Sequence, residues 1–173
     1  MLEAAKYSAN EVLRNGRRIV IRALKPDDRA DLIAAVEGSS NQSLYRRFFG
    51  AKRHFSEQEV SFFVNVDFVS HVALVAIAES NGRPLIVGGG RYVVTEPGKA
   101  EIAFAVVDQF QKQGIGATLM RHLVVLARNA NLKKLTAEVL PENVPMLRVF
   151  ENSGLSHAVV RKSGVVHVVL RLS

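Results

Sequence analysis

The stretch QKQGIGATLMRHLVVLARNA, residues 111–130, carries the strongest structural signal in the chain. It follows an apolar strand pattern that ends at Val106, and from Ile115 onward its apolar residues recur at helical spacing. Gly114 and Gly116 stand where this helix begins, although glycine is a weak helix former. The pattern therefore predicts a strand, a glycine-containing turn and a helix in immediate succession.

The turn is also a candidate anion site. The first turn of a helix leaves backbone N–H groups unpaired and carries partial positive charge. Gly114 and Gly116 lack the side chains that would keep a phosphate away from these amides, while Gln111, Lys112 and Gln113 add polar donors and one charge. The loop lacks the G-K-[ST] ending of a Walker A motif and the third glycine of the dinucleotide fingerprint. The sequence leaves two readings, a phosphate loop of another kind or a turn that only redirects the chain.

The remaining pattern predicts an α+β fold with a mixed sheet, in which one β-α-β crossover surrounds the quoted helix. Strands are expected at 18–24, 71–78, 85–94, 100–107, 134–140, 156–161 and 165–172. Helices are expected at 26–37, irregularly over 42–68 with a capping box at Ser56 and Glu59, at 115–130, and from 143 to about 153. Residues 1–16 are predicted to be a leader or linker stub before a single domain at 17–173.

Composition excludes several classes of function. The 173 residues suffice for one compact domain that needs no disulfide or metal cross-link. The absence of cysteine excludes disulfides, thiolate zinc sites and a cysteine nucleophile. The five histidines show no ligand spacing, so no metal is predicted. No segment resembles a membrane span or a secretory signal, which makes the cytoplasm the expected location and argues against a membrane partner.

The net charge of +7 suggests either a phosphate-bearing or otherwise acidic partner, or simply a solvated basic surface. An aromatic content of 7% and the lack of any nucleic-acid-reading motif argue against a nucleic-acid binder.

Two motifs together resemble one known family. Gln111-x-x-Gly114-x-Gly116 after a strand resembles the [RQ]-x-x-G-x-[GA] pyrophosphate loop of the GNAT superfamily of acyl-CoA-dependent N-acyltransferases, and NVPMLRVFENSGL at 143–155 is similar to that family's N-x-x-x-x-x-x-Y-E-x-x-G-F segment. The resemblance implies a mostly antiparallel sheet of about seven strands, flanked by helices and splayed at the crossover. It also implies acetyl-CoA as co-substrate. The cofactor-binding residues that it implies are Val106, Val107, Gln111, Lys112, Gln113, Gly114, Ile115, Gly116, Ala117 and Asn143.

In this family an amine attacks the thioester of acetyl-CoA directly, so a base must take the proton of the amine. Glu101 is the first candidate, because strand alternation puts it on one face with Ala103 and Ala105, whose small side chains leave an open trough. The alternative is that Glu101 is an ordinary surface glutamate. Reserve candidates are Glu138 and Asp108, and more distant ones are Asp67 and His71.

Three further positions have a predicted role. Phe150 stands where many family members carry a tyrosine that protonates the leaving thiolate, so no side-chain acid is expected there. Asn143 is expected to cap the following helix, to bond the pantetheine arm, or both. His122 is expected on the surface of the quoted helix.

The acceptor is suggested by a second resemblance. Residues 39–77 resemble the corresponding part of bacterial GNAT domains that acetylate protein lysines, notably domains that act on, or are fused to, acyl-CoA synthetases. This implies a protein with an exposed lysine, such as an acyl-CoA synthetase, as partner. Two alternatives stay open, a small-molecule N-acetyltransferase for a polyamine, amino acid or drug, and a CoA-binding sensor without turnover. A closed acidic pocket would favour a small cation, and an open groove a protein.

Overall fold

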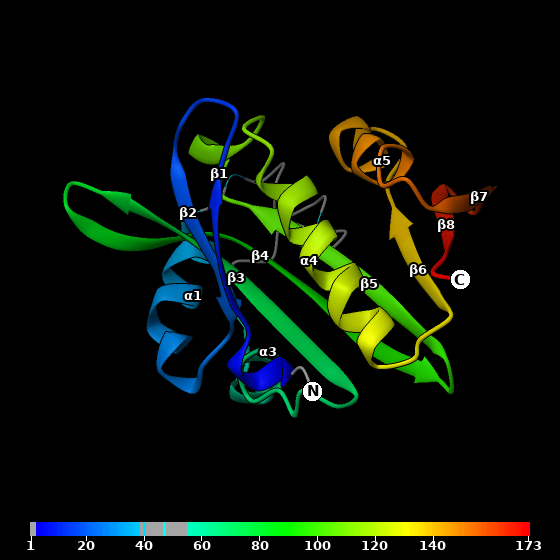
Figure 1. Ribbon diagram of the computed structural model, residues 1–173, viewed down its shortest axis with the longest axis horizontal. Coiled ribbons are helices and arrows are strands. Elements are labelled where there is room, and N and C mark those ends of the chain that lie inside the picture. The colour runs from blue at the N-terminus through cyan, green and yellow to red at the C-terminus, as the bar shows by residue number, and fades with distance from the viewer. Residues whose placement is uncertain (1–2, 39, 41–46, 48–54) are drawn as a thin grey trace.

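The computed structural model describes residues 3–38, 40, 47 and 55–173. Its centre is an eight-stranded sheet in the order β1-β2-β3-β4-β5-β6-β8-β7 (Figure 1). All neighbouring strands are antiparallel except β5 and β6, which are parallel and joined by the crossover helix. The strands are β1 (Ser8–Val12), β2 (Arg18–Ala23), β3 (His71–Ser80), β4 (Arg83–Glu96), β5 (Lys99–Val106), β6 (Lys134–Val139), β7 (Ser156–Lys162) and β8 (Val165–Arg171).

The predicted α+β architecture and β-α-β crossover are confirmed. The strand that the sequence analysis missed is β1, which pairs with β2 from Ser8↔Arg22 to Val12↔Arg18. Over its described part, 3–16, the predicted leader is thus the outer strand of the sheet and the turn that follows. The prediction was wrong there because an edge strand with alternating exposed residues carries little hydrophobic signal.

The predicted helices are present within the described residues. The helices are η1 (Ala4–Lys6), η2 (Pro26–Asp28), α1 (Arg29–Glu37), α3 (Glu57–Val64), η3 (Asp108–Phe110), α4 (Ile115–Asn129) and α5 (Val144–Glu151). The helix expected to reach residue 68 ends at Val64, and the short η1 and η3 were not predicted. The capping box that opens α3 is present, since Glu59 N–H donates to Ser56 Oγ and Ser56 N–H to Glu59 Oε1. The first part of the irregular helix predicted over 42–68, residues 42–54, lies outside the described residues, apart from Arg47.

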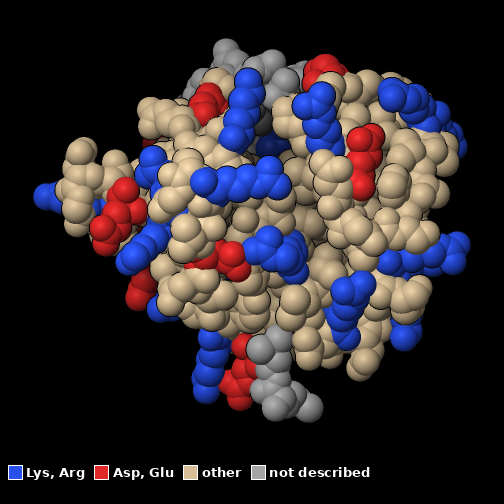
Figure 2. Space-filling model, turned by 45° about the horizontal axis from the view of Figure 1, so that its top comes forward, with Lys and Arg blue, Asp and Glu red and all other residues tan. Residues whose placement is uncertain are grey.

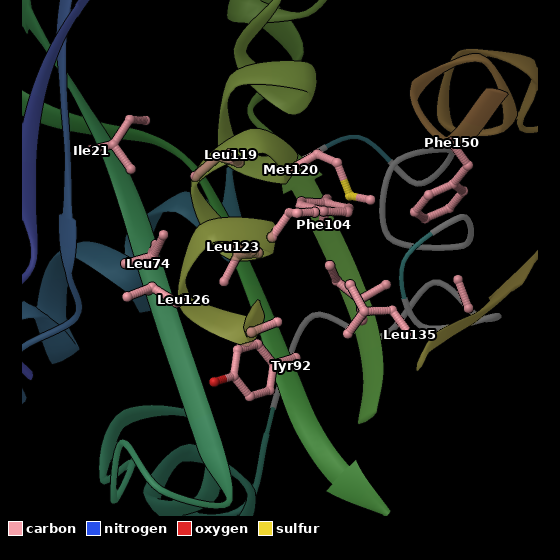
Figure 3. Close-up of a cluster of buried hydrophobic side chains, with 14 of the residues drawn as sticks. Ile21, Leu74, Tyr92, Phe104, Leu119, Met120, Leu123, Leu126, Leu135 and Phe150 are labelled. Carbon is pink, nitrogen blue, oxygen red and sulfur yellow. The ribbon is translucent and has the colours of Figure 1, made fainter. Parts of the chain in front are cut away.

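The sheet buries both faces. Helix α4 packs along β3, β4 and β5 over the main core, where Leu74, Phe104 and Leu123 are almost fully buried (Figure 3). A smaller core, which includes Ala73 and Val75, lies on the opposite face, where α1 packs against β4. Alternate residues of one strand therefore serve two cores, as the two-residue period of a strand requires.

Gly90 lets α4 approach the sheet closely. A Cβ at Gly90 would lie 2.7 Å from Phe104 Cδ1 and 2.9 Å from Leu123 Cδ1, distances that real side chains do not tolerate. The helix therefore rests directly on β4, and its first turn is held at the end of β5.

Strands β5 and β6 pair over a short stretch only. Their parallel register runs from Lys99↔Lys134 to Glu101↔Thr136 and then stops. Beyond this point the two strands diverge, which leaves backbone groups on the facing edges without a neighbouring strand. This opening in the sheet positions the candidate site.

Candidate active site

The start of helix α4 has the geometry of an anion-binding turn. Gly114 is the N-cap residue with φ = +90°, a left-handed conformation that favours glycine. A Cβ at this position would meet nothing within 4 Å, so the space in front of the turn is open. Within the described chain no side chain caps this helix end, and the first-turn amides lack acceptors inside the helix. The turn can therefore offer several N–H groups to one phosphate.

A cavity of about 500 Å³ extends from this turn into the opening between β5 and β6. Its walls come from β5, the 110–117 turn, β6 and the start of α5. Eight of the ten predicted cofactor residues line it, namely Val106, Gln111, Lys112, Gly114, Ile115, Gly116, Ala117 and Asn143. We call this the donor cavity.

The other two predicted cofactor residues, Gln113 and Val107, do not line the donor cavity. Gln113 accepts a hydrogen bond from Asn15 Nδ2 at 3.1 Å, which ties the turn to the β1–β2 hairpin. Val107 donates its N–H to the Val87 carbonyl at 2.8 Å, and its own carbonyl accepts from the Phe110 N–H at 2.8 Å. Val107 also lines a second cavity rather than the donor cavity. Its backbone groups are thus already hydrogen-bonded within the protein.

Asn143 and Phe150 form part of the wall near α5. Asn143 is buried and caps α5 through a hydrogen bond of 3.4 Å from the Met146 N–H to Oδ1, so the predicted capping role is confirmed. Phe150 is 2% exposed and packs on Phe104 with ring centroids 6.0 Å apart. Both residues line the donor cavity, and Phe150 contributes an apolar surface without a proton to donate.

Glu101 lies at the last paired position before β5 and β6 diverge. It is exposed, whereas Ile102 and Phe104 are buried on the other face, as the predicted alternation requires. Glu101 lines neither cavity directly. Its carboxylate is nevertheless close enough to Arg47 to raise the pKa of that guanidinium against the stronger lowering by burial. Arg47 lines both cavities, so Glu101 lies near the place where they meet.

The second cavity, of about 260 Å³, lies on the α1 and α3 side of the sheet, and we call it the acceptor cavity. Four residues line both cavities, namely Arg47, Ala103, Ala105 and Val106. The small side chains on the Glu101 face of β5 thus form the boundary between the two. A donor thioester and an acceptor amine could meet there.

The other candidate bases have different surroundings. Glu138 lines the donor cavity and lies 3.6 Å from His167 Nδ1. Asp108 accepts from the Ser40 N–H at 3.1 Å and from Gln111 Nε2 at 3.4 Å. Asp67 accepts from Ser70 Oγ and from three backbone N–H groups, and these hydrogen bonds hold its pKa well below the usual range. Asp67 therefore stabilises a turn.

Arg91 is a residue of the acceptor cavity that the sequence analysis did not identify. It stands opposite Ala103 on β4, on the same face as Glu101. Its Nη1 donates to the Phe63 carbonyl at 2.9 Å and to His71 Nε2 at 3.0 Å, and its guanidinium lies 5.0 Å from the Phe63 ring centroid. Burial, together with the nearby charge of Arg47, lowers the pKa of Arg91 to about 9. Strand alternation could have predicted which face of β4 carries Arg91. Its pairing with Ala103 of β5 is known only from the fold.

The GNAT acetyltransferase family model matches residues 38–155, which include the turn, β5, β6 and α5. The chain belongs to the GNAT family. It is 30% identical over 126 residues to Acetyltransferase PA5475 of Pseudomonas aeruginosa, covering 72% of this chain and 68% of that protein. It is 27% identical over 144 residues to Acetyltransferase Pat of Mycolicibacterium smegmatis, covering 82% of this chain but only 42% of that longer protein.

Solved structures agree with this assignment. The GNAT domain of S. lividans PAT superposes with a TM-score of 0.85 at 31% identity, covering 95% of this chain and 96% of that domain. At the level of fold alone, yncA from Salmonella typhimurium, solved with its cofactor acetyl-CoA, gives a TM-score of 0.69 at 18% identity, covering 90% and 94% of the two chains.

As a member of this family, the chain is an acyl-CoA-dependent N-acetyltransferase with acetyl-CoA as its co-substrate. The donor cavity suits this co-substrate, because a narrow opening through the sheet leads to a helix start that can hold a pyrophosphate. Lys and Arg side chains are scattered over the face of the molecule shown in Figure 2, with fewer Asp and Glu side chains among them, which also suits a phosphate-rich ligand.

Two further properties concern only the described ranges. No group of three or more His, Asp or Glu residues there is arranged to hold a metal ion. No helix there is both long and apolar enough to cross a bilayer.

Proposed function

We propose that this GNAT domain transfers the acetyl group of acetyl-CoA to the side-chain amine of a lysine in a protein, by direct attack and with Glu101 as general base. The observation that carries the proposal is the meeting of donor and acceptor cavities at Ala103 and Ala105, on the face of β5 that also bears Glu101. The likeness of residues 39–77 to protein-lysine GNAT domains, and the relationship to Pat, support the choice of acceptor.

The reaction needs a base because a lysine amine with an ordinary pKa is almost fully protonated near neutral pH. Loss of that proton costs about 4 kcal/mol. Glu101, directly or through a water, takes this proton from the ammonium, and the neutral amine nitrogen then bonds to the thioester carbon. The nitrogen gives up its second proton to water as the amide forms. The carbon–sulfur bond then breaks and CoA leaves as its thiolate. Since Phe150 supplies no proton, the thiolate takes one from water.

The charge of the acceptor cavity helps to distinguish a protein acceptor from a small cation such as a polyamine. Three arginines line it, Arg29, Arg47 and Arg91, against two glutamates, Glu37 and Glu57. Glu57 already forms a bidentate ion pair with Arg29 at 2.8 and 2.7 Å. This is not the acidic pocket expected for a polyamine or another small cation. The cavity therefore supports an acceptor other than a small polycation.

The test is incubation of the protein with isotopically labelled acetyl-CoA and a panel of proteins, including an acyl-CoA synthetase, followed by mass spectrometry. The proposal expects label on lysine side chains of at least one protein. Label found only on amino acids, drugs or polyamines would assign the small-molecule alternative, and acetyl-CoA binding without any transfer would assign a sensor. An acyl-CoA synthetase as partner and the cytoplasm as location stay predictions from the sequence.

A further inference from the structure

Arg91 is a partly buried cation with no carboxylate partner. All sixteen Asp and Glu residues of the chain lie within the described ranges, and none forms an ion pair or hydrogen bond with Arg91. Its polar partners are a carbonyl oxygen and an imidazole nitrogen, both neutral acceptors. Because a guanidinium only donates, His71 Nε2 must accept here, which requires the neutral form of the imidazole.

Arg22 provides the contrast within the same molecule. Its guanidinium donates through Nη1 and Nη2 to the two carboxylate oxygens of Asp28, both at 2.8 Å, and Asp28 is 6% exposed. A partly buried arginine with a structural role thus has its counter-charge in the fold. Burial of a charge without such a partner is costly, so Arg91 is retained at the expense of stability.

The position of Arg91 tells which ligand would supply the missing charge. It lines the acceptor cavity, and its Cα is paired with that of Ala103, where the two cavities meet. Adjacent strands lie about 4.8 Å apart, so a group held by Arg91 lies within a few residue lengths of the reacting amine. The hydrogen bonds to Phe63 and His71 both use Nη1, so Nη2 can still donate to an incoming carboxylate.

We propose that Arg91 binds a carboxylate carried by the acceptor, so that the preferred lysine has an acidic neighbour. This inference rests on the proposed function for its acceptor amine, but the carboxylate site itself does not. A free amino acid would present the same chemistry through its α-carboxylate. Repulsion of a protonated amine by Arg47 and Arg91 favours transfer of the amine's proton to Glu101.

The experiment compares two matched pairs of acceptors with the full chain and acetyl-CoA. The first pair is one peptide with glutamate or glutamine next to its single lysine. The second is free lysine and 1,5-diaminopentane, which is lysine without its carboxylate. The variants are Arg91→Gln, Arg91→Lys and the control Arg83→Gln, an exposed arginine on the same strand outside both cavities. Acetyl-CoA affinity and thermal unfolding of each variant establish that it is folded.

The inference expects the wild type and Arg83→Gln to favour the glutamate peptide about tenfold or more in kcat/KM, as a charge-assisted hydrogen bond allows. The ratio should fall to about one in Arg91→Gln and to an intermediate value in Arg91→Lys, because an ammonium lacks the bidentate fork. If Arg91→Gln does not fold, the intermediate ratio expected for Arg91→Lys still tests the proposal.

Other results would separate the carboxylate site from the proposed function. Equal acetylation within both pairs by the wild type, or a preference that survives Arg91→Gln, would overturn the carboxylate site and leave the proposed function standing. A preference that depends on Arg91 only within the lysine and diaminopentane pair, without peptide acetylation, would contradict the protein acceptor and support the site. No acetylation in either pair would contradict both.

Discussion

At the residue scale, one glycine decides whether the donor cavity can hold CoA. Gly114 combines a left-handed backbone with open space where a side chain would point. A glutamate there would place both bulk and negative charge in front of the amides that face the pyrophosphate.

We expect Gly114→Glu to weaken acetyl-CoA binding roughly 100-fold or more, since it removes charge-assisted hydrogen bonds worth about 1.5–3 kcal/mol each. Isothermal titration calorimetry measures this. Gly164→Glu is the matched control, because Gly164 also has a positive φ, at +74°, with nothing within 4 Å, but lies in the β7–β8 turn. Both variants place a side chain at a residue with positive φ. Equal affinities in the two variants would show that the 110–117 turn does not hold the pyrophosphate.

Local chemistry allowed several residues to be placed from the sequence. Asn81 and Gly82 both have positive φ, at 54° and 75°, as the predicted hairpin turn requires. Gly114 and Asn143 were placed because a helix start and a helix cap depend on a few neighbouring residues. Arg91 was not identified, because its importance depends on cross-strand pairing with Ala103, which no local pattern encodes.

At the scale of elements, a histidine holds α3, β3 and β4 together. His71 opens β3, is 7% exposed, and accepts from Arg91, which in turn donates to the α3 residue Phe63. Burial, with the positive charge of Arg91, lowers the pKa of His71 from 6.5 to about 4. Protonation would remove the acceptor lone pair and place two cations in contact.

This contact predicts a pH dependence of stability. The unfolded state binds the proton of His71 at a higher pH than the folded state, so the stabilisation is complete above about pH 6.5 and is lost as pH falls toward 4. We expect the free energy of unfolding to drop by up to about 3 kcal/mol over this window. Urea titrations at several pH values measure it. His71→Asn should flatten this slope, whereas replacement of the exposed His157 should not; a slope unchanged in His71→Asn would refute the assignment.

At the scale of the whole molecule, the N-terminal hairpin fastens the start of the chain to helix α4. Tyr7 Oη hydrogen-bonds to His122 Nδ1, while Glu11 bonds to His122 Nε2 at 2.9 Å and to Arg121 Nη2 at 2.8 Å. At the far end of the hairpin, Arg17 stacks on Phe110 at 5.0 Å from the ring centroid. The hairpin therefore supports both the middle of α4 and the turn before it.

These contacts explain what the sequence could not predict. Glu11 and Arg121 are 110 positions apart, and β1 alone has no hydrophobic period that marks it as a strand. His122, expected on the surface, is 8% exposed because Tyr7 and Glu11 cover it. The elements built by local periodicity were predictable, whereas those held by distant polar contacts were not.

We expect Glu11→Ala to lower the free energy of unfolding by about 1–3 kcal/mol, because it leaves the buried Nε2 donor of His122 without its acceptor and removes the more exposed ion pair with Arg121. Chemical denaturation followed by circular dichroism measures the change. Glu3→Ala is the control, since its ion pair with Lys6 is exposed and should contribute no more than about 0.5 kcal/mol. Similar effects of the two substitutions would mean that the hairpin adds little to the stability of the fold.

In the proposed reaction, acetyl-CoA and an amine meet on the Glu101 face of β5, where Glu101 takes the proton. Comparison of Glu101→Gln with Glu138→Gln tests it most directly, with acetyl-CoA affinity measured by calorimetry and turnover by mass spectrometry on the same acceptor. If Glu101 is the base, Glu101→Gln keeps its acetyl-CoA affinity and loses about 10²-fold in turnover, while Glu138→Gln turns over at a near-normal rate. Full activity of Glu101→Gln, with the loss appearing in Glu138→Gln instead, would contradict it and move the base to β6.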